Sequence, residues 1–218
     1  MDNLIYILFI CVAIPLLLMT LLVEKKARLP VGFMLTGVFV AVFASEVNGL
    51  LAKTLEMDVY RMTTMMNPIT EELLKALPIL YYAIVVSDKR ERLFTASMAI
   101  GIGFALLENA FFLLNDPDFS MLSAVIRAFG TGLMHGMCTL LVGVGISFVK
   151  RKSKLFAVGT FGLLSTAIVY HGIYNILIQS DYSTVGALLP IATYIPFLIW
   201  RLQIKHRLQA AAKKEQEA

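Results

Sequence analysis

Seven polar residues of the sequence have side chains that can move, hold or direct protons, and they lie within otherwise apolar stretches. They are three glutamates, two histidines, a lysine and an asparagine: Glu71, Glu72, Glu108, His135, His171, Lys75 and Asn175. A glutamate beside a histidine in a partly dry cavity can take a proton from water and return it to a leaving group. These residue types therefore predict acid–base chemistry, of which hydrolysis by an activated water is the simplest case.

The spacing of Glu71, Glu72 and Lys75 predicts an ion pair within one helix. Because a helix turns by about 100° per residue, Lys75 projects between Glu71 and Glu72 and can neutralise either one. His171 and Asn175 are also one helical turn apart and share a face. Our hypothesis is that Lys75 holds Glu71 ionised, which leaves Glu72 to handle water beside His171 and Asn175.

Composition indicates what surrounds these side chains. The chain has 218 residues, of which 58% are hydrophobic and 16% are charged, unlike a soluble domain of this length. Seven apolar segments have about the length that a helix needs to cross roughly 30 Å of hydrocarbon. They run approximately over residues 4–23, 31–52, 68–86, 95–114, 121–149, 155–179 and 185–200. We expect an all-α fold, a polytopic membrane helix bundle of about seven transmembrane helices.

The distribution of basic residues predicts the orientation of this bundle. Lysine and arginine gather in alternate connectors, which places the amino end outside and the carboxyl end in the cytoplasm. We expect one membrane domain over residues 1–200, with the motifs in 67–179, and a basic cytoplasmic tail over 201–218. The first span has no basic residue before it and is expected to be retained. Anionic lipid headgroups account for the net charge of +4, so we expect no nucleic-acid partner.

Depth in the membrane determines whether the polar residues can meet. With the orientation above and a rise of about 1.5 Å per residue, most of them fall about 5 to 12 Å beneath the outer surface. Four helices can then aim their acids and imidazoles into one site. Phe104, one turn before Glu108, can wall that site, and small residues such as Gly101 and Ala105 let a neighbouring helix approach closely. Glu46 and Asn48 are expected to form interhelical or interfacial hydrogen bonds.

Four motifs resemble the PrsW family of intramembrane proteases. They are Glu71-Glu72-Leu73-Leu74-Lys75, Gly103-Phe104-Ala105-Leu106-Leu107-Glu108-Asn109, His135 and His171-Gly172-Ile173-Tyr174-Asn175. CAAX-prenyl endopeptidases and bacteriocin-immunity proteins are more distantly similar. In the CAAX-type relatives the first motif usually ends in arginine and the second in histidine. Lys75 and Glu108 depart from that pattern, which favours the PrsW family.

The resemblance implies a glutamic-type intramembrane endopeptidase in a bacterial cell membrane. Its substrate would be a membrane-anchored protein cut near the outer face, as PrsW cuts an anti-sigma factor, and it would need no cofactor. The candidate catalytic residues are Glu71, Glu72, His135 and His171, and the candidate supporting residues are Lys75, Phe104, Glu108, Asn109 and Asn175.

Two other functions are compatible with the same residue types. A zinc-dependent intramembrane metalloprotease would bind its metal through His135, His171, Glu72 and Glu108. A proton-coupled transporter or membrane receptor also uses intramembrane glutamate, histidine and lysine. The sequence has no internal repeat of the kind found in many transporters, which counts weakly against the second alternative.

Overall fold

The structure, a computed structural model, describes residues 4–115, 120–150, 153–196 and 198–199. Its elements are α1 (Leu4–Leu22), α2 (Lys25–Thr54), α3 (Val59–Arg61), the π-helical turn η1 (Met62–Met66), α4 (Asn67–Tyr81), the π-helical turn η2 (Tyr82–Val86), α5 (Arg90–Asn115), α6 (Met121–Ile146) and α7 (Ser153–Ile178). A further helix covers Ser183–Pro196. The described residues contain no strand, so the all-α expectation is confirmed.

Five of these helices are long and apolar enough to cross a membrane, namely α1, α2, α5, α6 and α7. The expected span 68–86 corresponds to α4 and η2, which continue without a break from α3 and η1. The expected span 185–200 corresponds to the shorter helix Ser183–Pro196. The expected tail, 201–218, lies outside the described residues. Length and composition thus support five of the seven expected spans.

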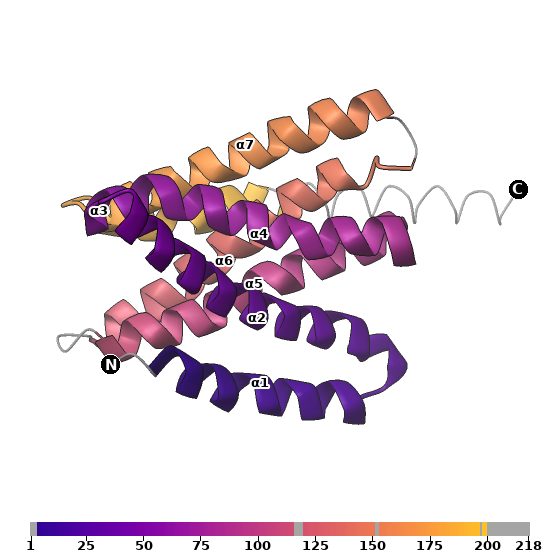
Figure 1. The fold of residues 1–218 in the computed structure, drawn as a ribbon, viewed down its shortest axis with the longest axis horizontal. Coiled ribbons are helices and arrows are strands. Elements are labelled where there is room, and N and C mark those ends of the chain that lie inside the picture. Colours follow the sequence, from indigo (N-terminus) through magenta and orange to yellow (C-terminus); the bar gives the residue numbers. More distant parts are fainter. Residues whose placement is uncertain (1–3, 116–119, 151–152, 197, 200–218) are drawn as a thin grey trace, which may run out of the picture.

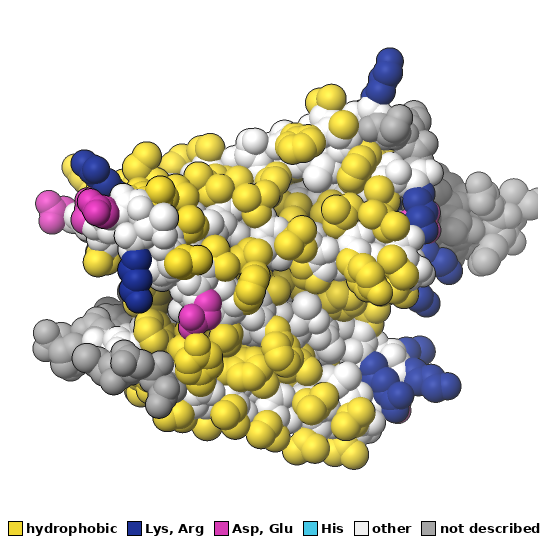
Figure 2. Space-filling model, in the orientation of Figure 1, with side chains coloured by type: hydrophobic (Ala, Val, Ile, Leu, Met, Phe, Trp, Pro, Cys, Tyr) yellow, Lys and Arg dark blue, Asp and Glu magenta, His cyan; other side chains and the backbone are white. Residues whose placement is uncertain are grey.

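The helices form a bundle in which α5 and α6 lie at the centre. α5 packs against α2 and α6, α6 packs against α7, and α1 packs against α2 and α5. α4 packs against α2, α6 and α7. In Figure 1 the α1–α2 turn, the start of α5 and the start of α7 lie at one end of the bundle. Figure 2 shows lysine and arginine gathered at that end and a largely hydrophobic face between the two ends.

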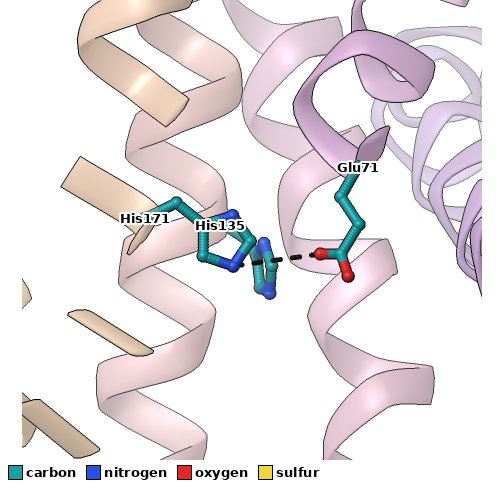
Figure 3. A group of neighbouring side chains, drawn as sticks. All are labelled: Glu71, His135 and His171. Carbon is teal, nitrogen blue, oxygen red and sulfur yellow. Dashed lines mark ion pairs between the residues drawn. The ribbon is translucent and has the colours of Figure 1, made fainter. Parts of the chain in front are cut away.

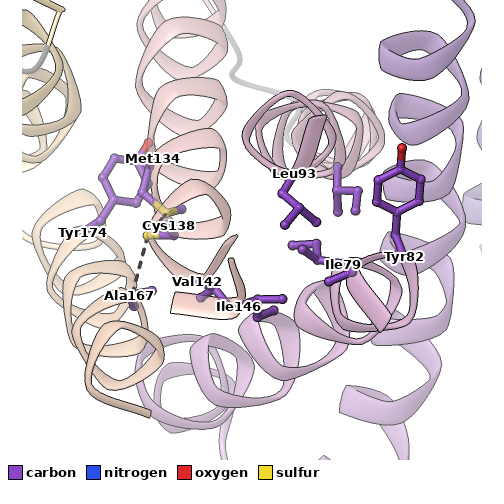
Figure 4. Close-up of a cluster of buried hydrophobic side chains, with 11 residues drawn as sticks. Ile79, Tyr82, Leu93, Met134, Cys138, Val142, Ile146, Ala167 and Tyr174 are labelled. Carbon is purple, nitrogen blue, oxygen red and sulfur yellow. Dashed lines mark hydrogen bonds between the residues drawn. The ribbon is translucent and has the colours of Figure 1, made fainter. Parts of the chain in front are cut away.

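A buried apolar cluster holds together the four helices that carry the candidate residues (Figure 4). It joins Ile79 of α4, Leu93 of α5, Val142 of α6 and Ala167 of α7, all of them almost fully buried. Burial of such side chains contributes about 25 cal/mol per Å² where they pack against one another instead of facing water. Within a membrane, van der Waals packing between the helices, and not the exclusion of water, drives their association. The cluster therefore fixes these helices against one another.

Glycines bring α5 into backbone contact with both of its neighbours. A Cβ atom at Gly101 would collide with the carbonyl group of His135 in α6, and one at Gly103 would collide with Met34 in α2. The close helix approach expected from the small residues of the 95–114 segment is confirmed. It also means that Gly101 sets how near His135 lies to α5.

We expect Gly101→Ala to destabilise the protein, because the added methyl group meets backbone that cannot rotate away. The expected loss is about 1–3 kcal/mol, typical of overpacking, seen as a lower melting temperature of the purified protein in detergent. Gly132→Ala in α6 is the matched control, since nothing lies within 4 Å of a Cβ atom there and alanine favours a helix. Equal melting temperatures of the two variants would contradict the close contact.

Candidate active site

Four helices supply the candidate catalytic side chains. α4 carries Glu71, Glu72 and Lys75, α5 carries Glu108, α6 carries His135 and α7 carries His171. All lie close together in the structure and all but Glu108 are buried. The structure therefore shows four helices converging on one polar site, as expected from the similar depths predicted for these residues in the membrane.

Lys75 lies at the centre of this polar group. Its Nζ atom is 2.7 Å from Glu72 Oε1 and 2.7 Å from His135 Nδ1, and it lies 4.4 Å from the centre of the Phe104 ring. An ammonium group has three donors and no acceptor. Lys75 therefore donates to Glu72 and to His135, and the aromatic face of Phe104 covers the charge on a third side.

The hydrogen bonds of the two imidazoles assign their tautomers. Because His135 Nδ1 accepts from the Lys75 ammonium, Nε2 carries the proton and donates to Glu108 Oε2 at 2.6 Å. His171 Nδ1 lies 3.0 Å from Glu72 Oε1, and since a carboxylate can only accept, this nitrogen carries the proton. In the neutral ring, His171 Nε2 then has a lone pair and no proton.

Glu71 lies opposite that lone pair. Its Oε2 atom is 3.9 Å from His171 Nε2, is buried, and has no hydrogen-bond partner among the described residues. Figure 3 shows the Glu71 carboxylate pointing towards the histidine rings. The other oxygen accepts from Asn48 Nδ2 at 3.4 Å, and the Thr70 hydroxyl donates to the Asn48 side-chain oxygen. Glu71 is therefore held in place through one oxygen while the other remains available.

A cavity of about 320 Å³ opens beside these groups. Glu71 and Glu108 line it, whereas Glu72, Lys75 and the two histidines do not. A chain of contacts connects its two lining glutamates: it runs from Glu108 through His135, Lys75 and Glu72 to His171, which faces Glu71. Two carboxylate side chains thus line the cavity, and the buried residues behind them form a connected network.

The prediction that Lys75 forms its ion pair with Glu71 is wrong. Lys75 contacts Glu72 and not Glu71, because Glu72 points to the side of α4 that faces His135 and His171. Glu71 instead accepts from Asn48 of α2 through one oxygen and faces His171 with the other, and its side chain lines the cavity. The sequence allows either pairing, since both glutamates are within one turn of the lysine.

The expected supporting residues differ in how close they come to the chemistry. Phe104 lines the cavity and its ring centre is 4.8 Å from that of His135, as expected for a wall. Asn175 also lines the cavity, but its Nδ2 atom donates to the Thr63 carbonyl of η1 at 2.8 Å. It therefore braces the π-helical turn that leads into α4. Asn109 has a buried side-chain oxygen without a partner among the described residues.

Two residues of the site were not assigned to it from the sequence. Asn48 does form an interhelical hydrogen bond, as expected, but its partner is Glu71. Glu46 also forms an interhelical hydrogen bond, in which it accepts from the Tyr6 hydroxyl at a distance of 2.6 Å. Unlike Asn48, Glu46 does not line the cavity. Arg127 lines the cavity, and its spacing from Thr131 and His135, four and eight residues, is the signal that places it on the same face of α6.

A metal ion would find suitable ligands here. Glu71, His135 and His171 each offer one ligand atom, and these atoms lie within 4.8 Å of one another. Nitrogen and carboxylate oxygen are donors that zinc accepts, so the residues fit a metal in type and position. The metal-ligand set expected from the sequence contained Glu72 and Glu108, whereas the structure groups Glu71 with the two histidines. Both ring nitrogens of His135 are engaged by Lys75 and Glu108, so ligation would require these contacts to change.

Comparison with models of known families identifies the family of this chain. A model of the family described as PrsW family intramembrane metalloprotease matches residues 25–201, which includes every candidate catalytic residue. Comparison with curated proteins and with solved structures found no match. The five apolar helices and this match identify an integral membrane protein. The chain belongs to the PrsW family of intramembrane proteases.

Proposed function

We propose that the protein is an intramembrane endopeptidase that hydrolyses a peptide bond with a water molecule activated by Glu71 and His171. The observation that carries the proposal is the pair of free acceptors, Glu71 Oε2 and His171 Nε2, 3.9 Å apart. One water molecule can donate to both atoms at ordinary hydrogen-bond lengths. Its lone pair is then directed away from them and towards a peptide carbonyl in the cavity.

The reaction needs one proton transfer in each direction. As the water oxygen bonds to the carbonyl carbon, a proton passes to the Glu71 carboxylate, and the carbonyl oxygen takes up negative charge. The C–N bond then breaks, and Glu71 returns the proton to the departing amine. His171 holds the water in line, because its Nδ1–H group donates to Glu72 and fixes the orientation of the ring.

The other members of the network position this pair. Lys75 neutralises Glu72, so that Glu72 can remain an acceptor for His171 in a buried site. His135 and Glu108 occupy the far side of Lys75. We assign Glu71 and His171 direct contact with water, and Glu72, Lys75 and His135 the role of holding His171. This replaces the hypothesis in which Glu72 handles water.

The substrate class follows from the surroundings of the cavity. A carboxylate-lined cavity within a helix bundle suits a membrane-anchored protein whose helix unwinds locally, because a peptide carbonyl must leave its helical hydrogen bond to be attacked. By the charge distribution of the sequence this cavity lies towards the outer face. Cleavage of an anti-sigma factor in a bacterial cell membrane fits that placement and remains part of the proposal.

A metal-dependent version of the same hydrolysis is the second candidate, favoured by the convergence of Glu71, His135 and His171. A zinc ion held by these residues would polarise the carbonyl group and lower the pKa of its bound water. The hydrogen bonds of His135 favour the metal-free version, since its Nε2 atom carries a proton while Lys75 donates to Nδ1.

Purified protein in lipid vesicles is expected to cleave a single-pass membrane protein, and chelation is expected to leave the rate unchanged. The substrate is to be found by comparing membranes of cells with and without the protein for a newly released external fragment. Metal content is measured on the same active sample. Stoichiometric zinc whose removal stops cleavage would establish the metal-dependent version. The proposed protease activity would be refuted if the purified protein cleaved none of the proteins whose fragments appear in cells only when this chain is present.

A further inference from the structure

One charged side chain in the cavity has no role in the chemistry described above. Arg127 of α6 lines the same cavity as Glu71 and Glu108. Its Nε atom is buried and has no hydrogen-bond partner among the described residues. The carbon at the centre of its guanidinium group lies 3.9 Å from the centre of the Phe112 ring. A permanently charged group is thus held over an aromatic face with a donor left free.

In the part of the chain that the structure describes, no ion pair and no hydrogen bond to Nε accounts for the position of this arginine. The charge of Glu108, which also lines the cavity, interacts with that of Arg127, but the Oε2 atom of Glu108 is held by His135 at 2.6 Å. Among the described residues Arg127 forms no ion pair within 4.0 Å. A buried donor without a partner is destabilising. A ligand that supplies an acceptor would recover that cost.

We propose that Arg127 is a specificity-determining residue that binds a carboxylate group of the substrate. This inference rests on the proposed function, because it takes the occupant of the cavity to be a substrate. A guanidinium group presents a fork of donors that matches a carboxylate with two parallel hydrogen bonds. The Phe112 ring, whose centre is 3.9 Å from the central carbon of the guanidinium group, attracts this charge and restricts where the fork can lie.

Helix geometry predicts where this carboxylate lies relative to the cleaved bond. Arg127, Thr131 and His135 are spaced by four residues on one face of α6, and Thr131 also lines the cavity. With a rise of about 1.5 Å per residue, Arg127 lies about 12 Å along the helix from His135, whose ring centre is 4.8 Å from that of His171 beside the reacting water. An extended peptide covers about 3.3 Å per residue. The carboxylate is therefore expected about three to four residues from the cleaved bond.

The test uses synthetic peptides with one apolar span and an external segment of alanine and serine. A single Asp is moved through this segment, and each peptide has a partner with Asn at the same position. Each peptide is made with a free and with an amidated carboxyl terminus, which separates a side-chain carboxylate from a terminal one. Binding and cleavage are measured with full-length protein in vesicles of phosphatidylcholine, with and without anionic phospholipid.

Wild-type protein is expected to bind the best Asp peptide on the order of tenfold to a hundredfold more tightly than its Asn partner. Arg127→Gln is expected to lose this preference, and Arg127→Lys to keep only part of it. Arg61→Gln is the matched control, because Arg61 is an exposed arginine paired with Asp58 and does not line the cavity. Melting temperatures show that each variant is folded.

The outcomes separate this inference from the proposed function. Equal binding of the Asp and Asn peptides by wild-type protein, or a preference that survives in Arg127→Gln, would overturn the carboxylate subsite. A preference that disappears when anionic lipid is added would also overturn it, since a lipid phosphate would then occupy the arginine. An Arg127-dependent preference without cleavage would leave the subsite standing and refute the protease. Cleavage of the Asp and Asn peptides without any preference between them would refute the carboxylate subsite and leave the protease activity standing.

Discussion

Glu71→Gln is expected to lower the rate of substrate cleavage by about 10²- to 10⁴-fold, the range for removing a general base. Glutamine has nearly the same shape and can still accept from Asn48, but it cannot take a proton from water. Because Glu71 Oε2 is buried without a partner, removing its charge is expected to leave the melting temperature unchanged or to raise it. The measurement is the cleavage rate in vesicles together with thermal unfolding in detergent.

Two other glutamine substitutions serve as references for this result. Glu46→Gln changes an exposed glutamate of α2 that does not line the cavity, and it is expected to cleave at the wild-type rate. Glu72→Gln is expected to lower both activity and stability, because Lys75 then loses its carboxylate partner. If Glu71→Gln keeps wild-type activity, Glu71 is not the base. If the Glu71 and Glu72 variants lose activity and stability equally, the two carboxylates act as one titrating unit.

Lys75→Met is expected to give the largest loss of stability among single substitutions in the site, about 3–5 kcal/mol. The change leaves the fully buried Glu72 carboxylate without its positive partner, and it removes the donor to His135 Nδ1. Methionine is similar to lysine in length, so lost packing is a minor cause. Thermal unfolding of the purified variant measures the effect, and Lys53→Met, at an exposed lysine of α2, is the control.

The double variant Glu72→Gln/Lys75→Met tests whether the ion pair itself causes this loss. Glutamine retains an acceptor for His171 Nδ1 while both charges disappear, so most of the lost stability is expected to return. Stability losses that simply add in the double variant would show that the two charges do not compensate each other. Activity is expected to remain low in the double variant, because His135 no longer receives a hydrogen bond at Nδ1.

Much of the fold and of the site could be predicted from the sequence for a physical reason. Hydrocarbon makes charge expensive, so the few ionisable residues within apolar segments stand out in a chain that is only 16% charged. The same apolar lengths predict helices, since a helix satisfies its own backbone hydrogen bonds. Glu71, Glu108, His135 and His171 could therefore be named, placed on four helices and brought to one depth.

The pairing within the site could not be predicted in this way. Lys75 is within one turn of both glutamates, and the choice depends on which side of α4 faces α6 and α7. Asn48 and Arg127 present the same difficulty, because an asparagine or arginine near a helix end can face lipid headgroups, water or a cavity. Rotation of a helix about its own axis depends on packing with its neighbours and leaves little trace in its length or composition.

The sequence by itself determined that this is a helical membrane protein with acids and imidazoles at one depth, because the cost of burying charge acts on each residue separately. Only the tertiary structure decided that Glu72 pairs with Lys75 while Glu71 faces the cavity. That choice depends on close contacts between helices, such as the one Gly101 permits with the backbone of His135. Such contacts arise from side chains far apart in the sequence, and hydrogen bonds at 2.6 to 3.0 Å between them require the helices to be in their final positions.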